Sequence, residues 1–170
     1  MSILLQCILF VRYIVAAMTR IIFVLLGIAV AVHAQVGELV DIGGTTYYVA
    51  NDVAGVDWNA ANWLCGNRSM VVVGLETPQE QNDINNWMRT NGHTGKWWTN
   101  GAFVLGSQDI WEWGTSGVQF QENDNRWAND PIQEPDGDPV RWANERVSLS
   151  IVNNALNSDQ ITASNHVICQ

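Results

Sequence analysis

The chain has 170 residues, with 17 acidic and 8 basic side chains, a formal net charge of −9 and an isoelectric point near 4.5. This balance argues against nucleic acid or an anionic membrane surface as the partner, because both require a basic face. Nine tryptophans and 47% hydrophobic residues exclude an intrinsically disordered chain, which cannot hold so much apolar surface.

The first 34 residues have the pattern of a targeting segment. Two apolar runs, residues 3–17 and 21–34, are separated by a short stretch that begins at Met18. The second run follows an arginine and ends in a small-residue cleavage site at Ala34, which is typical of a secretory signal peptide. The alternative is a membrane anchor formed by both runs, but neither run reaches the roughly 20 apolar residues that span a bilayer. We expect cleavage after Ala34, with Met18 as a second candidate for the true start, and a secreted, extracellular domain over residues 35–170.

Removal of the leader would leave 136 residues, enough for one domain with a hydrophobic core. Two of the 8 basic residues leave with it, so 6 remain against all 17 acidic residues, a net charge of −11.

Two cysteines also remain, Cys65 and Cys169. In an oxidising compartment this pair predicts a disulfide, and the alternative is two free thiols. The triplet Asn67-Arg68-Ser69 makes Asn67 a predicted site of N-linked glycosylation.

Two helices are predicted near the start of the domain from their caps. Asp57 is a good N-cap, apolar residues follow it at helical spacing as far as Cys65, and Gly66 ends the helix. Thr77 begins a capping box, with proline at the first helical position and glutamate three residues after the cap. This box predicts a second helix over residues 78–90.

Short strands are predicted around and after these helices. Each segment is β-branched or aromatic, or places its apolar side chains two residues apart, as in a strand with one buried face. The segments are residues 45–49, 71–73, 111–113, 118–120, 147–151 and 166–169. The two helices lie early in the domain and most of the short strands lie late in it, which predicts a single α+β domain.

Residues 123–149 form an irregular, acidic segment. Its three prolines exclude a continuous helix, because each removes a backbone donor and restrains the residue before it. Crowded carboxylates repel one another unless a cation lies among them, and Ca²⁺ prefers such oxygen ligands. The segment therefore predicts either a calcium-holding loop or a solvated acidic loop. Its carboxylates are Asp124, Asp130, Glu134, Asp136, Asp138 and Glu145.

The order of several short motifs resembles that of the C-type lectin-like domain over about residues 47–169. The matching pieces are residues 58–65, 76–81, 111–113 (Trp-Glu-Trp), 125–127 (Asn-Arg-Trp), 134–136 (Glu-Pro-Asp) and 167–170. The resemblance implies an α+β fold with two helices, two small antiparallel sheets and a long loop that binds calcium. In calcium-dependent members, a cis proline in the central triplet turns two side-chain oxygens toward the ion, and the sugar ligates the same ion through two vicinal hydroxyls.

Carried onto this chain, the resemblance implies a shared set of calcium and sugar ligands. The Glu-Pro-Asp triplet is a hybrid of the family's two usual forms and leaves the sugar class undecided. The family's Asn-Asp pair falls on Asn157 and Ser158, so the aspartate is missing, and Asp159 lies one residue late. The expected metal ligands are Glu134, Asp136, Glu145, Asn157 and Asp159, of which the first four would also contact the sugar.

The first functional hypothesis is therefore a secreted, calcium-dependent lectin whose partners are glycans or glycoproteins. The alternative is a calcium-independent protein-binding module on the same fold with a degenerate sugar site, which the serine at position 158 favours. Trp127 and Trp142 could stack on a sugar ring, although such tryptophans are more often core. An enzyme is not expected, because His93 and His166 have no nucleophile or metal partner recognisable in the sequence.

Overall fold

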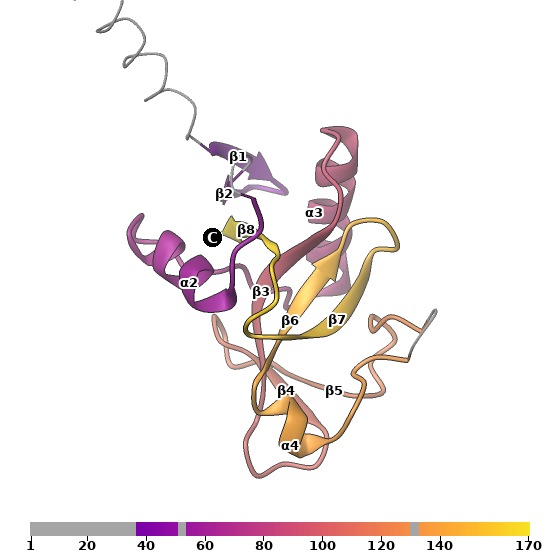
Figure 1. The fold of residues 1–170 in the computed structure, drawn as a ribbon. Coiled ribbons are helices and arrows are strands. Elements are labelled where there is room, and N and C mark those ends of the chain that lie inside the picture. The colour runs from indigo at the N-terminus through magenta and orange to yellow at the C-terminus, as the bar shows by residue number, and fades with distance from the viewer. Residues whose placement is uncertain (1–36, 51–53, 130–132) are drawn as a thin grey trace, which may run out of the picture. The chain divides into compact units, whose positions relative to one another are not determined.

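The computed structural model describes residues 37–50, 54–129 and 133–170 (Figure 1). The leader predicted over residues 1–34, with its cleavage site, lies outside these residues. Across the described part of the chain, no helix is long and apolar enough to cross a membrane. The elements are β1 Glu38–Ile42, β2 Thr45–Val49, α2 Trp58–Gly66, α3 Pro78–Thr90, β3 Lys96–Phe103, β4 Ile110–Trp113, β5 Gln119–Gln121, α4 Pro139–Trp142, β6 Glu145–Ser150, β7 Ala155–Gln160 and β8 His166–Cys169.

The strands join into one mixed sheet of eight strands, rather than the two small antiparallel sheets that the resemblance implies. The last strand, β8, makes the connection: it pairs antiparallel with β2 along one edge and parallel with β3 along the other. The remaining pairs are antiparallel, β1 with β2, β3 with β4 and β6, β4 with β5, and β6 with β7. Figure 1 shows β8 between the β1–β2 hairpin and β3.

Both predicted helices form where their caps place them. The Asp57 carboxylate accepts a hydrogen bond from the N–H three residues later at 2.8 Å, and the Thr77 hydroxyl accepts one from Glu80 N at 3.1 Å. The Glu80 side chain accepts from Glu76 N at 3.0 Å and from the Tyr47 hydroxyl at 3.1 Å, so it links α3 to β2. Burial raises the pKa of Glu80, and the neighbouring Glu76 carboxylate adds to the increase.

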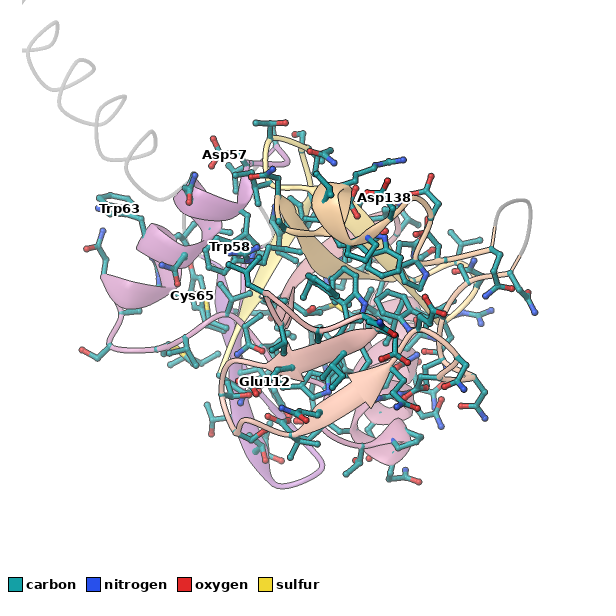
Figure 2. All side chains as sticks on the ribbon, turned by 90° about the horizontal axis from the view of Figure 1, so that it is seen from below. Asp57, Trp58, Trp63, Cys65, Glu112 and Asp138 are labelled. Atoms are coloured by element: carbon teal, nitrogen blue, oxygen red, sulfur yellow. A yellow bond between two sulfur atoms is a disulfide. The ribbon has the colours of Figure 1, made fainter. Side chains whose placement is uncertain are left out.

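A third helix, α4, interrupts the acidic segment that the sequence predicts to be irregular. Asp138 caps it by accepting hydrogen bonds from Val140 N at 3.0 Å and Arg141 N at 3.1 Å, and Pro139 occupies the first helical position (Figure 2). Proline is compatible with that position because its missing N–H has no partner there in any helix. The prolines therefore exclude a long helix but not a single turn.

The strand predictions are confirmed at β2, β4, β5, β6 and β8. The prediction for residues 71–73 is wrong, since Val72 makes only an isolated bridge to Cys169 and Val71 is 49% exposed. These valines exchange backbone hydrogen bonds with Ile168 and Gln170 without the regular pairing of a strand. The structure adds β1, β3 and β7, which no predicted segment covers.

Aromatic side chains build most of the core. Trp111 is fully buried, and its ring centroid lies 5.7 Å from that of Phe103, 5.2 Å from Trp127 and 5.9 Å from Trp142. A second cluster surrounds the predicted Cys65–Cys169 disulfide, which the structure contains. Trp127 and Trp142 are each 4% exposed, so they are core residues and do not present a face for a sugar ring.

Aromatic and imidazole rings form a row from Trp87 through His93 and Trp97 to His166. Burial lowers the pKa of His93 below its usual value of 6.5. The Glu38 carboxylate opposes this by raising the pKa of His93, whereas the charge of His166 lowers it further. The net lowering means that the folded chain resists protonation of His93.

This depressed pKa predicts that acid weakens the fold through His93. Above pH 6.5, the ordinary pKa of the group, its contribution to stability is fully present, and it is lost as the pH falls through the folded pKa. Between about pH 7.5 and 5.5, the urea midpoint of the wild type should therefore fall further than that of His93→Gln. Glu38 and His166 are present in both proteins, so the comparison isolates His93. An equal fall in both proteins would contradict the prediction.

Candidate functional site

The residues predicted to bind calcium come from the loop before α4 and from two strands. Glu134 and Asp136 lie in the loop, Glu145 begins β6, and Asn157 and Asp159 lie on β7. The peptide bond between Glu134 and the proline after it is cis, as the resemblance implies. The structure brings the three acidic residues of the loop and β6 together, but it places the two β7 residues elsewhere.

Arg141 lies between two of the predicted ligands. Its Nε donates to Glu145 Oε1 at 2.8 Å, and its two terminal nitrogens lie 3.2 Å from the two carboxylate oxygens of Asp136. Glu145 is fully buried, while the Arg141 side chain is 47% exposed. The charges of Glu145 and Asp136 raise the pKa of Arg141 above its usual range. A guanidinium thus supplies the positive charge that these carboxylates need.

Glu134 is held by the residue that replaces the expected aspartate. Its Oε2 accepts hydrogen bonds from Ser158 N at 3.1 Å, from the Ser158 hydroxyl at 2.8 Å and from Asp136 N at 3.2 Å. The Ser158 hydroxyl donates a hydrogen bond to Glu134, whereas an aspartate at this position would have offered only another hydrogen-bond acceptor. The Glu134 carboxylate therefore closes the loop against β7 without an ion.

Asn157 and Asp159 lie on the opposite face of β7 from this cluster. In the register of β6 and β7, Glu145 pairs with Gln160 and Ser148 pairs with Asn157, and successive side chains of a strand alternate between faces. Asp159 accordingly forms an ion pair with Lys96 at 2.9 Å, and accepts hydrogen bonds from the hydroxyl of Ser148 at 2.6 Å and from the side-chain amide of Asn165 at 3.1 Å. The Asn157 amide donates to a backbone carbonyl on its own strand at 3.2 Å.

The arrangement does not fit a calcium ion. Ca²⁺ takes six to eight oxygen ligands, whereas the oxygens of Asp136 are paired with Arg141 and one oxygen of Glu134 with Ser158. Glu145 Oε2 is buried without a hydrogen-bond partner in the described part of the chain, but this oxygen and the second oxygen of Glu134 are together too few. Over residues 37–50, 54–129 and 133–170, no group of three or more His, Cys, Asp or Glu side chains is placed to hold a metal ion.

Trp142 connects the loop of residues 134–136 to the aromatic core. Trp142 Nε1 donates to the backbone carbonyl of Asp136 at 2.8 Å, while its ring packs against Phe103 with centroids 5.3 Å apart. The same tryptophan lies on α4 next to Arg141, so one short helix fixes both the loop backbone and the guanidinium. The sequence contains one signal for this arrangement, because Arg141 and Glu145 are four residues apart.

No protein-family model matches the sequence, and no curated protein matches it. Solved structures do match. One is TC14, a C-type lectin from the tunicate Polyandrocarpa misakiensis, with 18% identity and a TM-score of 0.57 over 72% of this chain and 95% of that one. A mouse scavenger receptor C-type lectin carbohydrate-recognition domain matches with 20% identity and a TM-score of 0.57 over 77% and 91% of the two chains. A complex of SPL-1 with GlcNAc matches with 17% identity and a TM-score of 0.58 over 77% and 90%. The domain therefore has the C-type lectin-like fold, which confirms the resemblance.

Proposed function

We propose that this domain of C-type lectin-like fold is a secreted, non-enzymatic binding module for glycans or glycoproteins, and that it binds them through the loop of residues 134–136. The observation that carries the proposal is the loop of residues 134–136, which Glu134 holds against β7 through its hydrogen bonds with Ser158, in a cluster of buried and half-buried polar groups. The similarity in fold to a C-type lectin carbohydrate-recognition domain, and to SPL-1 in its complex with GlcNAc, supports this choice of ligand.

We further propose that glycan binding here does not depend on calcium. Calcium-dependent binding, which the sequence favours, would require Arg141 to leave both Asp136 and Glu145, and Ser158 to leave Glu134. The contacts of these residues favour the calcium-independent form, in which Arg141 is the permanent cation of the site. A guanidinium has several N–H donors in a fixed plane and can donate to sugar hydroxyls from its exposed side.

A protein-binding module is the second candidate. It is favoured because the site's carboxylates are largely satisfied within the domain, which leaves fewer polar groups for a sugar. Val140, which is 82% exposed on α4 beside Arg141, would suit an apolar contact with a protein. This candidate predicts that no glycan competes for the site.

A glycan array, probed once in calcium and once in chelator, separates these possibilities. We expect equal binding in both conditions, loss of binding in Asp136→Ala, and retention in Glu122→Gln, which removes an exposed carboxylate on the turn after β5. Binding that disappears in chelator would restore calcium dependence. Absence of binding to every glycan would favour the protein-binding alternative.

Removal of the Arg141 charge should change how the domain responds to calcium. Arg141→Gln leaves Asp136 facing the buried Glu145 without a cation, so we expect a lower melting temperature in chelator and a rise when millimolar calcium is added. Calcium at about 100 times its Kd adds about 2.7 kcal/mol by mass action. The wild type, and Arg89→Gln as a control for an exposed arginine on α3, should melt at the same temperature with and without calcium. A calcium-dependent rise in the wild type would contradict this prediction.

A further inference from the structure

Trp63 is the one tryptophan among the exposed large hydrophobic residues of the described chain, with 70% of its surface exposed. In Figure 2 its side chain points outward from α2, whereas Trp58 lies on the side of the helix that faces the rest of the domain. Trp58 is partly buried there and donates from Nε1 to a carbonyl of β3 at 3.1 Å. Within the described residues, the outer face of α2 therefore presents an indole ring that is mostly uncovered.

Asn67, the predicted glycosylation site, lies one helical turn beyond Trp63. Its N–H donates to the Trp63 carbonyl at 3.0 Å, and its backbone still has α-helical angles, φ −64° and ψ −13°. Helical residues four positions apart share a face, and side chains lean toward the N-terminal end of the helix. The Asn67 side chain consequently lies over the turn that carries the exposed indole.

The groups around Asn67 leave its amide accessible. Arg68 turns away, since its terminal nitrogens donate to the Leu64 carbonyl and the Tyr48 hydroxyl, each at 3.0 Å, and its guanidinium lies 4.2 Å from the Tyr48 ring centroid. Cys65 is fully buried, so the disulfide lies on the inner side of the helix. Asn67 itself is exposed, and so is the turn that follows it, where Ser69 has a positive φ of 57°.

We propose that Asn67 carries an N-linked glycan whose first N-acetylglucosamine packs its apolar face on the Trp63 indole. In the transfer, the Asn67 amide nitrogen loses a proton and bonds to the anomeric carbon of a lipid-diphosphate-linked oligosaccharide, whose bond to the diphosphate breaks. The C–H groups of the sugar ring then meet the electron-rich face of the indole. The proposal is independent of glycan binding at the acidic loop, because the sugar is covalently attached at Asn67, the C-cap of α2.

The test uses the full chain secreted by cultured eukaryotic cells. Intact mass before and after an amidase that removes N-glycans and converts the linked asparagine to aspartate gives the occupancy of Asn67, with Asn67→Gln as the unmodified reference. The melting temperature is then compared before and after deglycosylation in wild type, Trp63→Ala and Leu105→Ala. Leu105 is a matched control because it is 74% exposed on another part of the domain.

We expect deglycosylation to lower the melting temperature of wild type and Leu105→Ala by several degrees, and that of Trp63→Ala by clearly less. The new aspartate adds the same charge to all three proteins, so its own effect cancels in the comparison. The proposal is overturned if Asn67 of the wild type is unmodified, or if all three proteins lose the same number of degrees.

Discussion

Replacement of Trp142 by alanine should lower the free energy of unfolding by about 3–5 kcal/mol, the usual cost of deleting a buried tryptophan. Trp142 is 4% exposed and contacts Phe103 and Trp111, so the substitution leaves a cavity in the middle of the aromatic core. It also removes the hydrogen bond to the Asp136 carbonyl. Because that bond fixes the loop of residues 134–136, we expect glycan binding to be weakened in protein that is still folded. Urea denaturation measures the first effect and the glycan array the second.

Two controls separate packing from hydrogen bonding. Trp142→Phe keeps an aromatic ring but has no N–H, so it should recover part of the lost stability while the loop remains weakened. Trp63→Ala, made in cells that do not glycosylate, removes an exposed indole and should change stability by about 0.5 kcal/mol or less. If Trp142→Ala were no more destabilising than Trp63→Ala, the aromatic core would not support the site as described.

Loss of the Cys65–Cys169 disulfide should destabilise the domain by about 2–5 kcal/mol. The bond joins α2 to β8 across 104 residues, and in the chain-entropy model a loop of about 100 residues is worth about 4.7 kcal/mol. Alanine is the better replacement, because both sulfurs are buried and a serine hydroxyl would need a partner there. The double variant Cys65→Ala, Cys169→Ala should therefore unfold at a lower urea concentration than the wild type.

Reduction provides the matching control for the disulfide. Wild-type protein treated with a thiol reductant should approach the urea midpoint of the double variant, and the double variant should not respond to reductant. A double variant with the wild-type midpoint would show that packing around β8 alone fixes the end of the chain.

Elements with local chemical signals could be predicted from the sequence, and elements defined by their neighbours could not. Asp57 and Thr77 predict the starts of α2 and α3, because a capping side chain accepts a hydrogen bond from a backbone N–H in the first turn of its own helix. The strand β3 carries no such signal. It pairs with β4, β6 and β8, and Trp97 and Trp98 are buried on its two faces, so the alternation that marks a half-buried strand is absent.

In the candidate site, too, residues with a local sequence signal could be predicted, whereas residues placed by strand pairing could not. The loop of residues 134–136 and Glu145 were predicted to meet, and the structure places Asp136 and Glu145 on one guanidinium, with Glu134 hydrogen-bonded to the N–H of Asp136. Asn157 and Asp159 were assigned to the same set, but the register of β7 turns them to the other face. A one-residue difference decides the face of a strand, and that register depends on pairing with β6. Arg146, the neighbour of Glu145, lies on that other face too, 4.8 Å from the Trp58 ring centroid.

The position of β8 has a consequence for biosynthesis. Residues 166–169 fill the gap between β2 and β3, so the sheet stays open while this stretch is still inside the ribosomal tunnel. Closure of the sheet and formation of the Cys65–Cys169 disulfide must both wait until Cys169 has emerged, and the unpaired edges of β2 and β3 are open to chaperones until then. We therefore expect this domain to mature after translation has passed its last strand, rather than progressively from its N-terminal side.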